Sequence, residues 1–206
     1  WLFNTDVAHK VFELRDTISH LQDPSLRRLF GIILGSSLVE NSNVMINGKG
    51  RRYRKNWQHR PKTRHDLMAT IHTLAERCFA DIESFNSKSA TLAKIDLQDI
   101  RDTNLSFPEF DVSVFSPPYP NSFDYTDVYN IELWMLGYLK TRSQNVDLRK
   151  QTLTSHVQVS KPFSRLVDQP EILSATVSEL EKQRDRLWDQ RIPSMIETYF
   201  FEMSGL

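Results

Sequence analysis

The sequence contains one cysteine, six glycines and no long apolar run. A single cysteine excludes an internal disulfide and any zinc site built from several cysteines, and it favours a reducing, cytoplasmic setting. No apolar stretch approaches the roughly 18 residues of a transmembrane helix, and the N-terminus shows no signal-peptide pattern. The histidines lack metal-ligand spacing, so we expect no metal site. Six glycines are few for an enzyme that cradles a nucleotide.

The 26 basic and 26 acidic residues cancel in number but are unevenly distributed. Eight Lys and Arg residues and no acid lie between Lys49 and Arg64, so the remaining chain carries a net charge of minus eight. Segment 47–64 has no apolar period and predicts an exposed loop. Its basic side chains suit phosphate contacts, and its aromatic ones suit stacking or wedging against bases. These residues are Lys49, Arg51, Arg52, Tyr53, Arg54 and Trp57. The alternative is a solvated loop whose charge serves solubility.

Apolar residues at helical spacing predict several helices, the second with an Asp23-Pro24 start. The predicted helices cover 7–21, 24–40, 66–85 and 123–139, with two more after Pro170 and Pro193. Residues 141–169 are polar and predict irregular structure.

Two segments alternate like strands, Thr91 to Leu97 and Asp111 to Phe115. A two-stranded sheet alone is marginal, and the order strand, loop, strand, proline-rich turn, helix is typical of an α/β sheet. We therefore favour an α/β fold in which these strands belong to a sheet whose other strands are absent from this chain. The alternative is a mostly helical protein.

The second predicted strand leads into Ser116-Pro117-Pro118-Tyr119, at the strand end where open α/β sheets bind ligands. Two prolines fix φ and remove two N–H donors, so the turn offers carbonyl acceptors. The exocyclic amine of a flipped-out base would donate to the Ser116 hydroxyl and a proline carbonyl, while Tyr119 stacks on the ring. Extruding a base costs about a few kcal/mol, and stacking returns about 1–3 kcal/mol. The alternative is a polyproline turn or a partner-docking peptide.

This segment matches all four positions of the motif [Ser/Asp/Asn]-Pro-Pro-[Tyr/Phe/Trp]. The chain thereby resembles the DNA amino-methyltransferases, which use S-adenosylmethionine to methylate the exocyclic nitrogen of cytosine or adenine. Upstream, Gln98-Asp99-Ile100-Arg101 is similar to the Gly-Asp-Ala-Arg element of many such enzymes. The segments 48–53 and 121–137 resemble a bacterial subgroup of the family.

The resemblance implies a Rossmann-like methyltransferase core with a helical insertion, acting on duplex DNA by direct in-line methyl transfer. It places Asp99 near the adenine end of the cofactor, although this carboxylate equally suits pairing with Arg101. Asn121, Asp124 and Tyr125 would contact the substrate; for the last two, a helix cap and a core aromatic are the alternatives. Serine at the first motif position favours cytosine N4 over adenine N6.

The chain departs from the family in one respect: the Phe-x-Gly-x-Gly turn that holds the cofactor is absent. We expect that turn before Trp1 and the remaining strands after Leu206, in a fragment or a split enzyme with a companion chain. The expected divisions are a helical segment, a methyltransferase core and a polar and helical segment that suits target recognition. They cover 1–88, 89–140 and 141–206. Rival functions are a non-catalytic DNA-binding subunit and an RNA amino-methyltransferase. Restriction–modification is the usual context of such enzymes.

Overall fold

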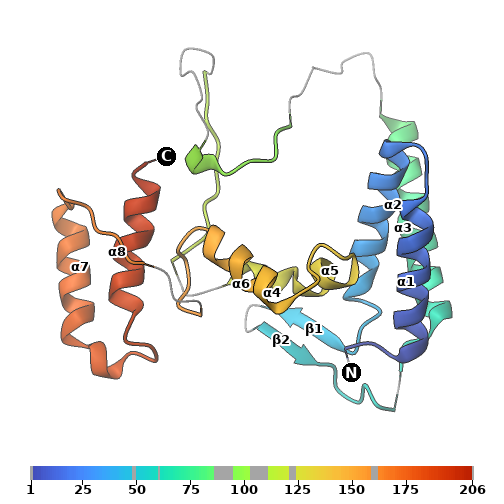
Figure 1. The fold of residues 1–206 in the computed structure, drawn as a ribbon, viewed down its shortest axis with the longest axis horizontal. Coiled ribbons are helices and arrows are strands. Elements are labelled where there is room, and N and C mark those ends of the chain that lie inside the picture. The colour runs from blue at the N-terminus through green and yellow to red at the C-terminus, as the bar shows by residue number, and fades with distance from the viewer. Residues whose placement is uncertain are drawn as a thin grey trace. The chain divides into compact units, whose positions relative to one another are not determined.

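A computed structural model describes residues 2–47, 50–59, 61–85, 95–102, 111–120, 124–158 and 162–205. The described residues form helices and one two-stranded sheet (Figure 1). The chain divides into two compact units, which we describe separately. Unit 1 comprises Trp1–Leu92 and Thr126–Arg142, and unit 2 comprises Ala93–Tyr125 and Ser143–Leu206.

Three helices of unit 1 pack side by side (Figure 1). They are α1 (Thr5–Ser19), α2 (Pro24–Leu38) and α3 (Arg64–Ser84), and they confirm the three helices predicted there. The Asp23 side chain accepts hydrogen bonds from the Ser25 and Leu26 amides and so caps α2. A reciprocal capping box between Thr63 and Asp66 fixes the start of α3.

The core of unit 1 is formed by apolar side chains from these helices, from the first strand and from α5 (Asn130–Met135). Its most buried members are Val7, Val11, Leu34, Leu38, Val44, Leu67 and Ile131. The predicted helix over 123–139 is divided into α4 (Tyr125–Val128) and α5. Gly137, at φ +83°, follows α5 in the left-handed conformation that commonly ends a helix.

The predicted loop over 47–64 is wrong in part, because Gly50–Tyr53 forms strand β2. It pairs antiparallel with β1 (Val44–Asn47), so that Val44 lies opposite Tyr53 and Asn47 opposite Gly50. In β1 the first three residues are all apolar, and Val44 is buried while Met45 is exposed. The polar, basic β2 is held by backbone hydrogen bonds, which its side-chain pattern does not reveal.

The two predicted strands are not strands in the described residues. Ile95–Leu97 and Asp111–Phe115 have no regular structure, and positions 91–94 lie outside the described residues. The alternating side chains are almost fully exposed at Ile95 (92%), Leu97 (104%) and Val114 (92%). A strand requires a neighbour for its backbone groups, and no strand in the described part of the chain pairs with either segment.

Unit 2 contains α6 (Arg142–Gln151), α7 (Glu171–Lys182) and α8 (Ile192–Met203). The last two confirm the helices predicted after Pro170 and Pro193, and they pack against each other (Figure 1). The irregular structure predicted for 141–169 is wrong over α6 and confirmed over 152–158 and 162–169. The sequence of α6 is polar and has no apolar stripe, so its pattern does not predict a helix. Two short 3-10 helices, Ile100–Asp102 and Arg184–Arg186, complete the regular structure described there.

We expect Leu67→Ala to lower the free energy of unfolding by about 2–5 kcal/mol, because it leaves a cavity in a fully buried position. Met68→Ala is the matched control, since the neighbouring Met68 is 40% exposed, and its loss should be below about 1 kcal/mol. Urea unfolding followed by circular dichroism measures both. Equal losses would contradict the packing of α3.

A second prediction concerns the half-buried carboxyl of Glu132 on α5. Burial raises its pKa, and a backbone hydrogen bond offsets this in part. The folded state therefore binds the proton more tightly than the unfolded chain. The free energy of unfolding should fall as pH rises from the unfolded to the folded pKa, and then stay level. Glu132→Gln should remove that fall from melting curves recorded against pH. Glu83→Gln, at an exposed position, should retain it.

Candidate functional site

The Ser-Pro-Pro-Tyr segment lies in unit 2, within the described stretch 111–120. Ser116 and Tyr119 are exposed, Tyr119 by 66%, while Pro117 and Pro118 are half-buried. The backbone N–H of Tyr119 donates to the Tyr125 hydroxyl over 3.4 Å. The hydroxyl and the aromatic ring predicted to hold a base are therefore accessible, and Tyr125 restrains the backbone between them.

Tyr125, a predicted substrate contact, begins α4 and is 38% exposed. Burial raises the pKa of Tyr199 on α8, and Tyr125 raises it to a smaller extent. Within unit 2, the Tyr125 hydroxyl is a hydrogen-bond partner of the predicted catalytic segment. Asn121 lies outside the described residues.

Asp124, the other predicted substrate contact, is buried, with a side chain only 1% exposed. Its Oδ2 lies 2.7 Å from the Arg149 Nε, and its Oδ1 lies 3.8 Å from the His156 Nε2. The His156 side chain is 2% exposed. This carboxylate therefore attaches the residue before α4 to α6 and to the segment after it. Its substrate role stays a prediction.

Asp99, the predicted cofactor residue, pairs with Arg101. Its Oδ1 accepts from the Arg101 amide at 3.0 Å and Nε at 2.9 Å, and its Oδ2 accepts from a terminal guanidinium nitrogen at 2.5 Å. Arg101 also donates to Glu202 at 3.2 Å and to the Gln151 carbonyl. Hydrogen bonding to Asp99 raises the pKa of Arg101. This is the pairing that the sequence offered as an alternative to cofactor contact.

Glu202 extends this network to the segment after α6. It accepts a hydrogen bond from the Thr154 amide at 2.6 Å and one from the Thr154 hydroxyl at 3.1 Å. The stretch that precedes the Ser-Pro-Pro-Tyr segment is thus tied to α8 by charge-assisted hydrogen bonds. Sequence reasoning missed Arg149, His156 and Glu202, because no motif or apolar period marks a polar residue that becomes buried.

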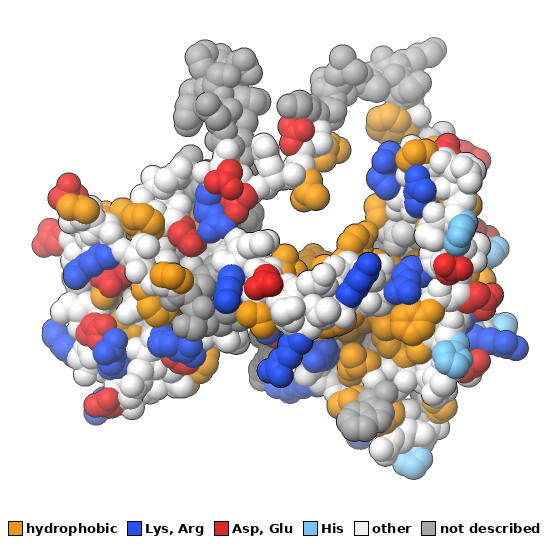
Figure 2. Space-filling view, viewed as in Figure 1, with side chains coloured by type: hydrophobic (Ala, Val, Ile, Leu, Met, Phe, Trp, Pro, Cys, Tyr) orange, Lys and Arg blue, Asp and Glu red, His pale blue; other side chains and the backbone are white. Residues whose placement is uncertain are grey.

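The basic segment 47–64 of unit 1 includes strand β2 of the β1–β2 hairpin, and basic side chains gather where this hairpin lies (Figure 2). Arg51 and Arg52 on β2 are exposed, and in the described part of the chain neither forms an ion pair. Tyr53 stacks on Trp57, with ring centroids 5.2 Å apart and an interplanar angle of 26°. Lys49 lies outside the described residues.

Arg54, which follows β2, differs from Arg51 and Arg52 because its side chain binds backbone carbonyls. Its Nε donates to the Ser42 carbonyl at 3.2 Å, and a terminal nitrogen donates to the Val39 carbonyl at 3.0 Å. Val39 is the C-cap of α2, whose last carbonyls lack partners within the helix. A cation at this end is also favoured by the helix dipole. Arg54 thus anchors the hairpin to α2.

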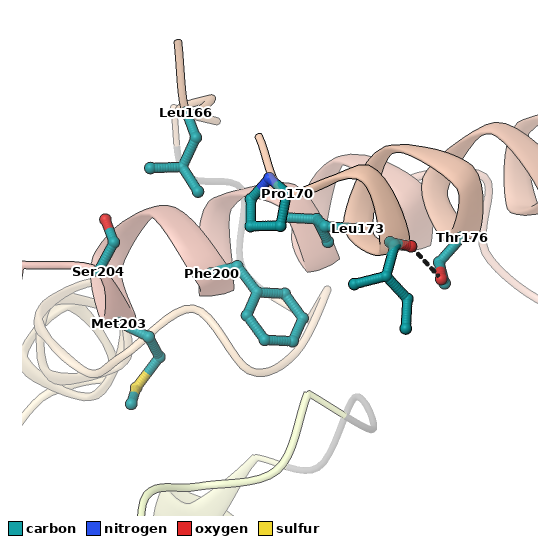
Figure 3. A pocket seen from close by; sticks show the side chains of 8 residues that line it. Leu166, Pro170, Leu173, Thr176, Phe200, Met203 and Ser204 are labelled. Atoms are coloured by element: carbon teal, nitrogen blue, oxygen red, sulfur yellow. Dashed lines mark hydrogen bonds between the residues drawn. The ribbon is translucent and has the colours of Figure 1, made fainter. Parts of the chain in front are cut away.

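A pocket of about 530 Å³ lies in unit 2 between α7 and α8 (Figure 3). Its lining is mainly apolar and contains none of the predicted site residues. The lining residues are Leu166, Pro170, Ile172, Leu173, Thr176, Phe200, Met203 and Ser204. A base amine needs hydrogen-bond acceptors, so this pocket is not where the sequence motif predicts substrate binding.

Two features are absent from the described ranges. Over those ranges, no helix has the length and apolar character needed to cross a bilayer. The same residues contain no group of three or more His, Cys, Asp or Glu side chains placed to hold a metal ion.

Comparison with known proteins supports the methyltransferase resemblance. The chain is 33% identical over 105 residues to the curated protein "Type II methyltransferase M.AvaI" from Nostoc sp. (strain PCC 7120 / SAG 25.82 / UTEX 2576), and to the protein of that name from Anabaena variabilis. Each similarity covers 46% of this chain but only 21% of the relative, so the chain spans about a fifth of the length of these relatives. No protein-family model matches the chain, and no solved structure matches it significantly.

We expect Asp124→Asn to lower the free energy of unfolding by about 3 kcal/mol, because it removes the charge that faces Arg149 inside unit 2. Asp127→Asn is the control, since Asp127 is an exposed carboxylate on the adjoining turn. Chemical unfolding at constant pH measures both variants. If Asp124→Asn is as stable as Asp127→Asn, the buried ion pair is not what holds this segment.

Proposed function

We propose that this chain is the base-binding part of an S-adenosylmethionine-dependent DNA amino-methyltransferase. The reaction is methyl transfer to the exocyclic nitrogen of a flipped base, with cytosine N4 favoured over adenine N6 by Ser116. The observation that carries the proposal is the accessible Ser-Pro-Pro-Tyr segment, in a chain partly similar to a type II methyltransferase. Restriction–modification, in the cytoplasm, is the setting that this similarity favours.

Residues of this chain would bind and orient the target nucleobase in this reaction. The Ser116 hydroxyl and the carbonyls of Pro117 and Pro118 accept hydrogen bonds from the amine, which orients its lone pair and stabilises the positive charge that develops on nitrogen. The two prolines cannot donate in return, since they lack N–H groups. Tyr119 stacks on the base and offsets part of the cost of extrusion.

The described residues do not by themselves fit S-adenosylmethionine. The carboxylate of Asp99 is occupied by Arg101 on both oxygens. The chain's sequence also lacks a Phe-x-Gly-x-Gly turn. We therefore derive no catalytic step on the cofactor side. S-adenosylmethionine as methyl donor is proposed from the similarity to methyltransferases alone.

An α/β core is part of the proposal. Segments 95–97 and 111–115 carry alternating apolar side chains that are exposed in the described residues. Exposed apolar side chains at a period of two are the pattern of strands that await neighbours. We propose that both segments join a Rossmann-like sheet with strands that the described residues do not supply, including strands of a companion chain. The catalytic turn would then follow the end of a paired strand.

Duplex DNA is the proposed substrate, and the hairpin of unit 1 is the proposed contact. Arg51 and Arg52 are exposed cations suited to phosphates, together with the sequence neighbour Lys49. Arg54 contributes by fixing the hairpin to α2. Three residues of the segment that follows the turn remain proposed substrate contacts. They are Asn121, Asp124 and Tyr125.

A non-catalytic DNA-binding subunit is the second candidate. The pairing of Asp99 with Arg101 favours it, because this pair occupies the predicted cofactor carboxylate. This candidate predicts DNA binding without methyl transfer.

The test is methyl transfer from labelled S-adenosylmethionine to mixed-sequence duplex DNA, with the products digested and identified by mass. The chain is assayed within its complete gene product and with the products of neighbouring genes. We expect N4-methylcytosine, or else N6-methyladenine. DNA binding without any methylated base would favour the second candidate, and methylation of RNA alone would favour an RNA amino-methyltransferase.

Variants of the motif test the residue roles in the same assay. Tyr119→Ala should raise KM for DNA about 5- to 150-fold, the equivalent of about 1–3 kcal/mol of lost stacking. Pro118→Ala should lower kcat more than DNA affinity, because it adds backbone freedom and an N–H donor at the turn. Tyr138→Ala is the control, since it removes another exposed tyrosine, 74% exposed, outside the motif. Undiminished turnover in both motif variants would contradict the catalytic assignment.

A further inference from the structure

The strand register separates two adjacent arginines that look alike in the sequence. Side chains on successive strand residues point to opposite faces, and directly paired residues share a face. Arg51 lies opposite Ile46 and Tyr53 opposite Val44, whereas Arg52 lies opposite Met45. Arg51 and Tyr53 therefore share one face of the hairpin, and Arg52 lies on the other.

The turn that follows β2 holds the Tyr53 ring in place. Asn56, at φ 59°, occupies the left-handed region that asparagine tolerates, and the Trp57 N–H donates to the Arg54 carbonyl at 3.3 Å. This turn brings the half-buried Trp57 against Tyr53. Tyr53 nevertheless keeps 48% of its surface exposed. The tyrosine ring is thus held in place and accessible.

The rest of the hairpin limits how this face can move. The Arg54 amide donates to the Asn43 carbonyl at 2.9 Å, and its guanidinium donates to the Val39 carbonyl at the C-cap of α2 and to the Ser42 carbonyl before β1. Val44, on the same face as Arg51 and Tyr53, is buried in the core of unit 1, and Ile46 on that face packs against the core. The face is thereby attached to the core at β1, while the Arg51 and Tyr53 side chains of β2 stay exposed. The hairpin therefore presents Arg51 and Tyr53 from a fixed base, which reduces the entropy lost when a ligand binds.

We propose that Arg51 and Tyr53 bind a single unstacked nucleotide of duplex DNA, with Arg51 on its phosphate and Tyr53 stacked on its base. Two residues apart on one strand face, their Cα atoms are separated by about 7 Å, which suits one phosphate and the base attached to it. The local excess of eight basic residues makes a polyanion the complementary partner. Trp57 supports the tyrosine from behind. The inference deepens the DNA contact proposed above and rests on it.

The test measures binding of the full chain to two labelled duplexes, without methyl transfer. One duplex is fully paired, and the other carries a single bulged 2-aminopurine. We expect the bulged duplex to bind about 5- to 150-fold more tightly, the range equivalent to one base–aromatic stack, and its 2-aminopurine fluorescence to be quenched. Tyr53→Ala should abolish both effects, and Tyr53→Phe should retain them.

Arg51→Ala and Arg52→Ala form a matched pair, with the same loss of charge on neighbouring positions of one strand. In double-mutant cycles with Tyr53→Ala, the effect of Arg51→Ala on the bulged duplex should depend on Tyr53, and that of Arg52→Ala should be additive. Melting temperatures close to that of the unmodified chain show that the hairpin variants fold.

Several results would overturn the proposal. They are equal affinity for both duplexes, a bulge preference that survives Tyr53→Ala, and equal coupling of Arg51 and Arg52 to Tyr53. Tighter binding of the corresponding bulged RNA would overturn the assignment to DNA. A bulge preference in a protein without methyl transfer would uphold this inference while the proposed enzyme activity fails.

Discussion

A β-strand is stable only when a neighbouring strand provides partners for its backbone N–H and C=O groups. In the described residues, β1 and β2 meet this requirement for each other, and segments 95–97 and 111–115 have no such neighbour. Their alternating apolar side chains are also exposed, because in the described residues no layer packs over them. Because Ser116 directly follows the second segment, the placement of the proposed base-binding turn depends on how that segment is paired. The role proposed for these four residues therefore depends on backbone hydrogen bonds to a neighbouring strand.

The contacts of charged residues distinguish groups that the sequence presents as equivalent. Asp124 and Asp99 are both carboxylates near the motif, but one is buried against Arg149 and the other forms a more exposed pair with Arg101. Arg54 donates to the carbonyl of Val39, the C-cap of α2, whereas Arg51 is exposed on β2. A cation that satisfies carbonyls of its own fold is less available to a phosphate. Partner and burial, rather than residue type, therefore indicate which side chains suit a ligand.

The helices with an apolar stripe and a capping signal were predictable from the sequence. Asp23-Pro24 and the Thr63–Asp66 capping box begin α2 and α3 through local contacts, and local contacts are readable from neighbouring residues. The polar helix α6 and the basic strand β2 were not predictable. Helix α6 has no apolar stripe, and β2 depends on pairing with β1, so neither leaves a periodic signal.

By itself, the sequence determined the composition of the Ser-Pro-Pro-Tyr segment, its stiffness, its acceptor groups and its resemblance to methyltransferases. It also determined the helices whose ends are fixed by neighbouring residues. Only the tertiary structure decided that Asp124 is enclosed with His156, that Arg54 caps α2, and that Arg51 shares a face with Tyr53. These relations join residues that lie far apart in the chain, or depend on strand register. Burial and register result from packing the whole fold, so no local pattern encodes them.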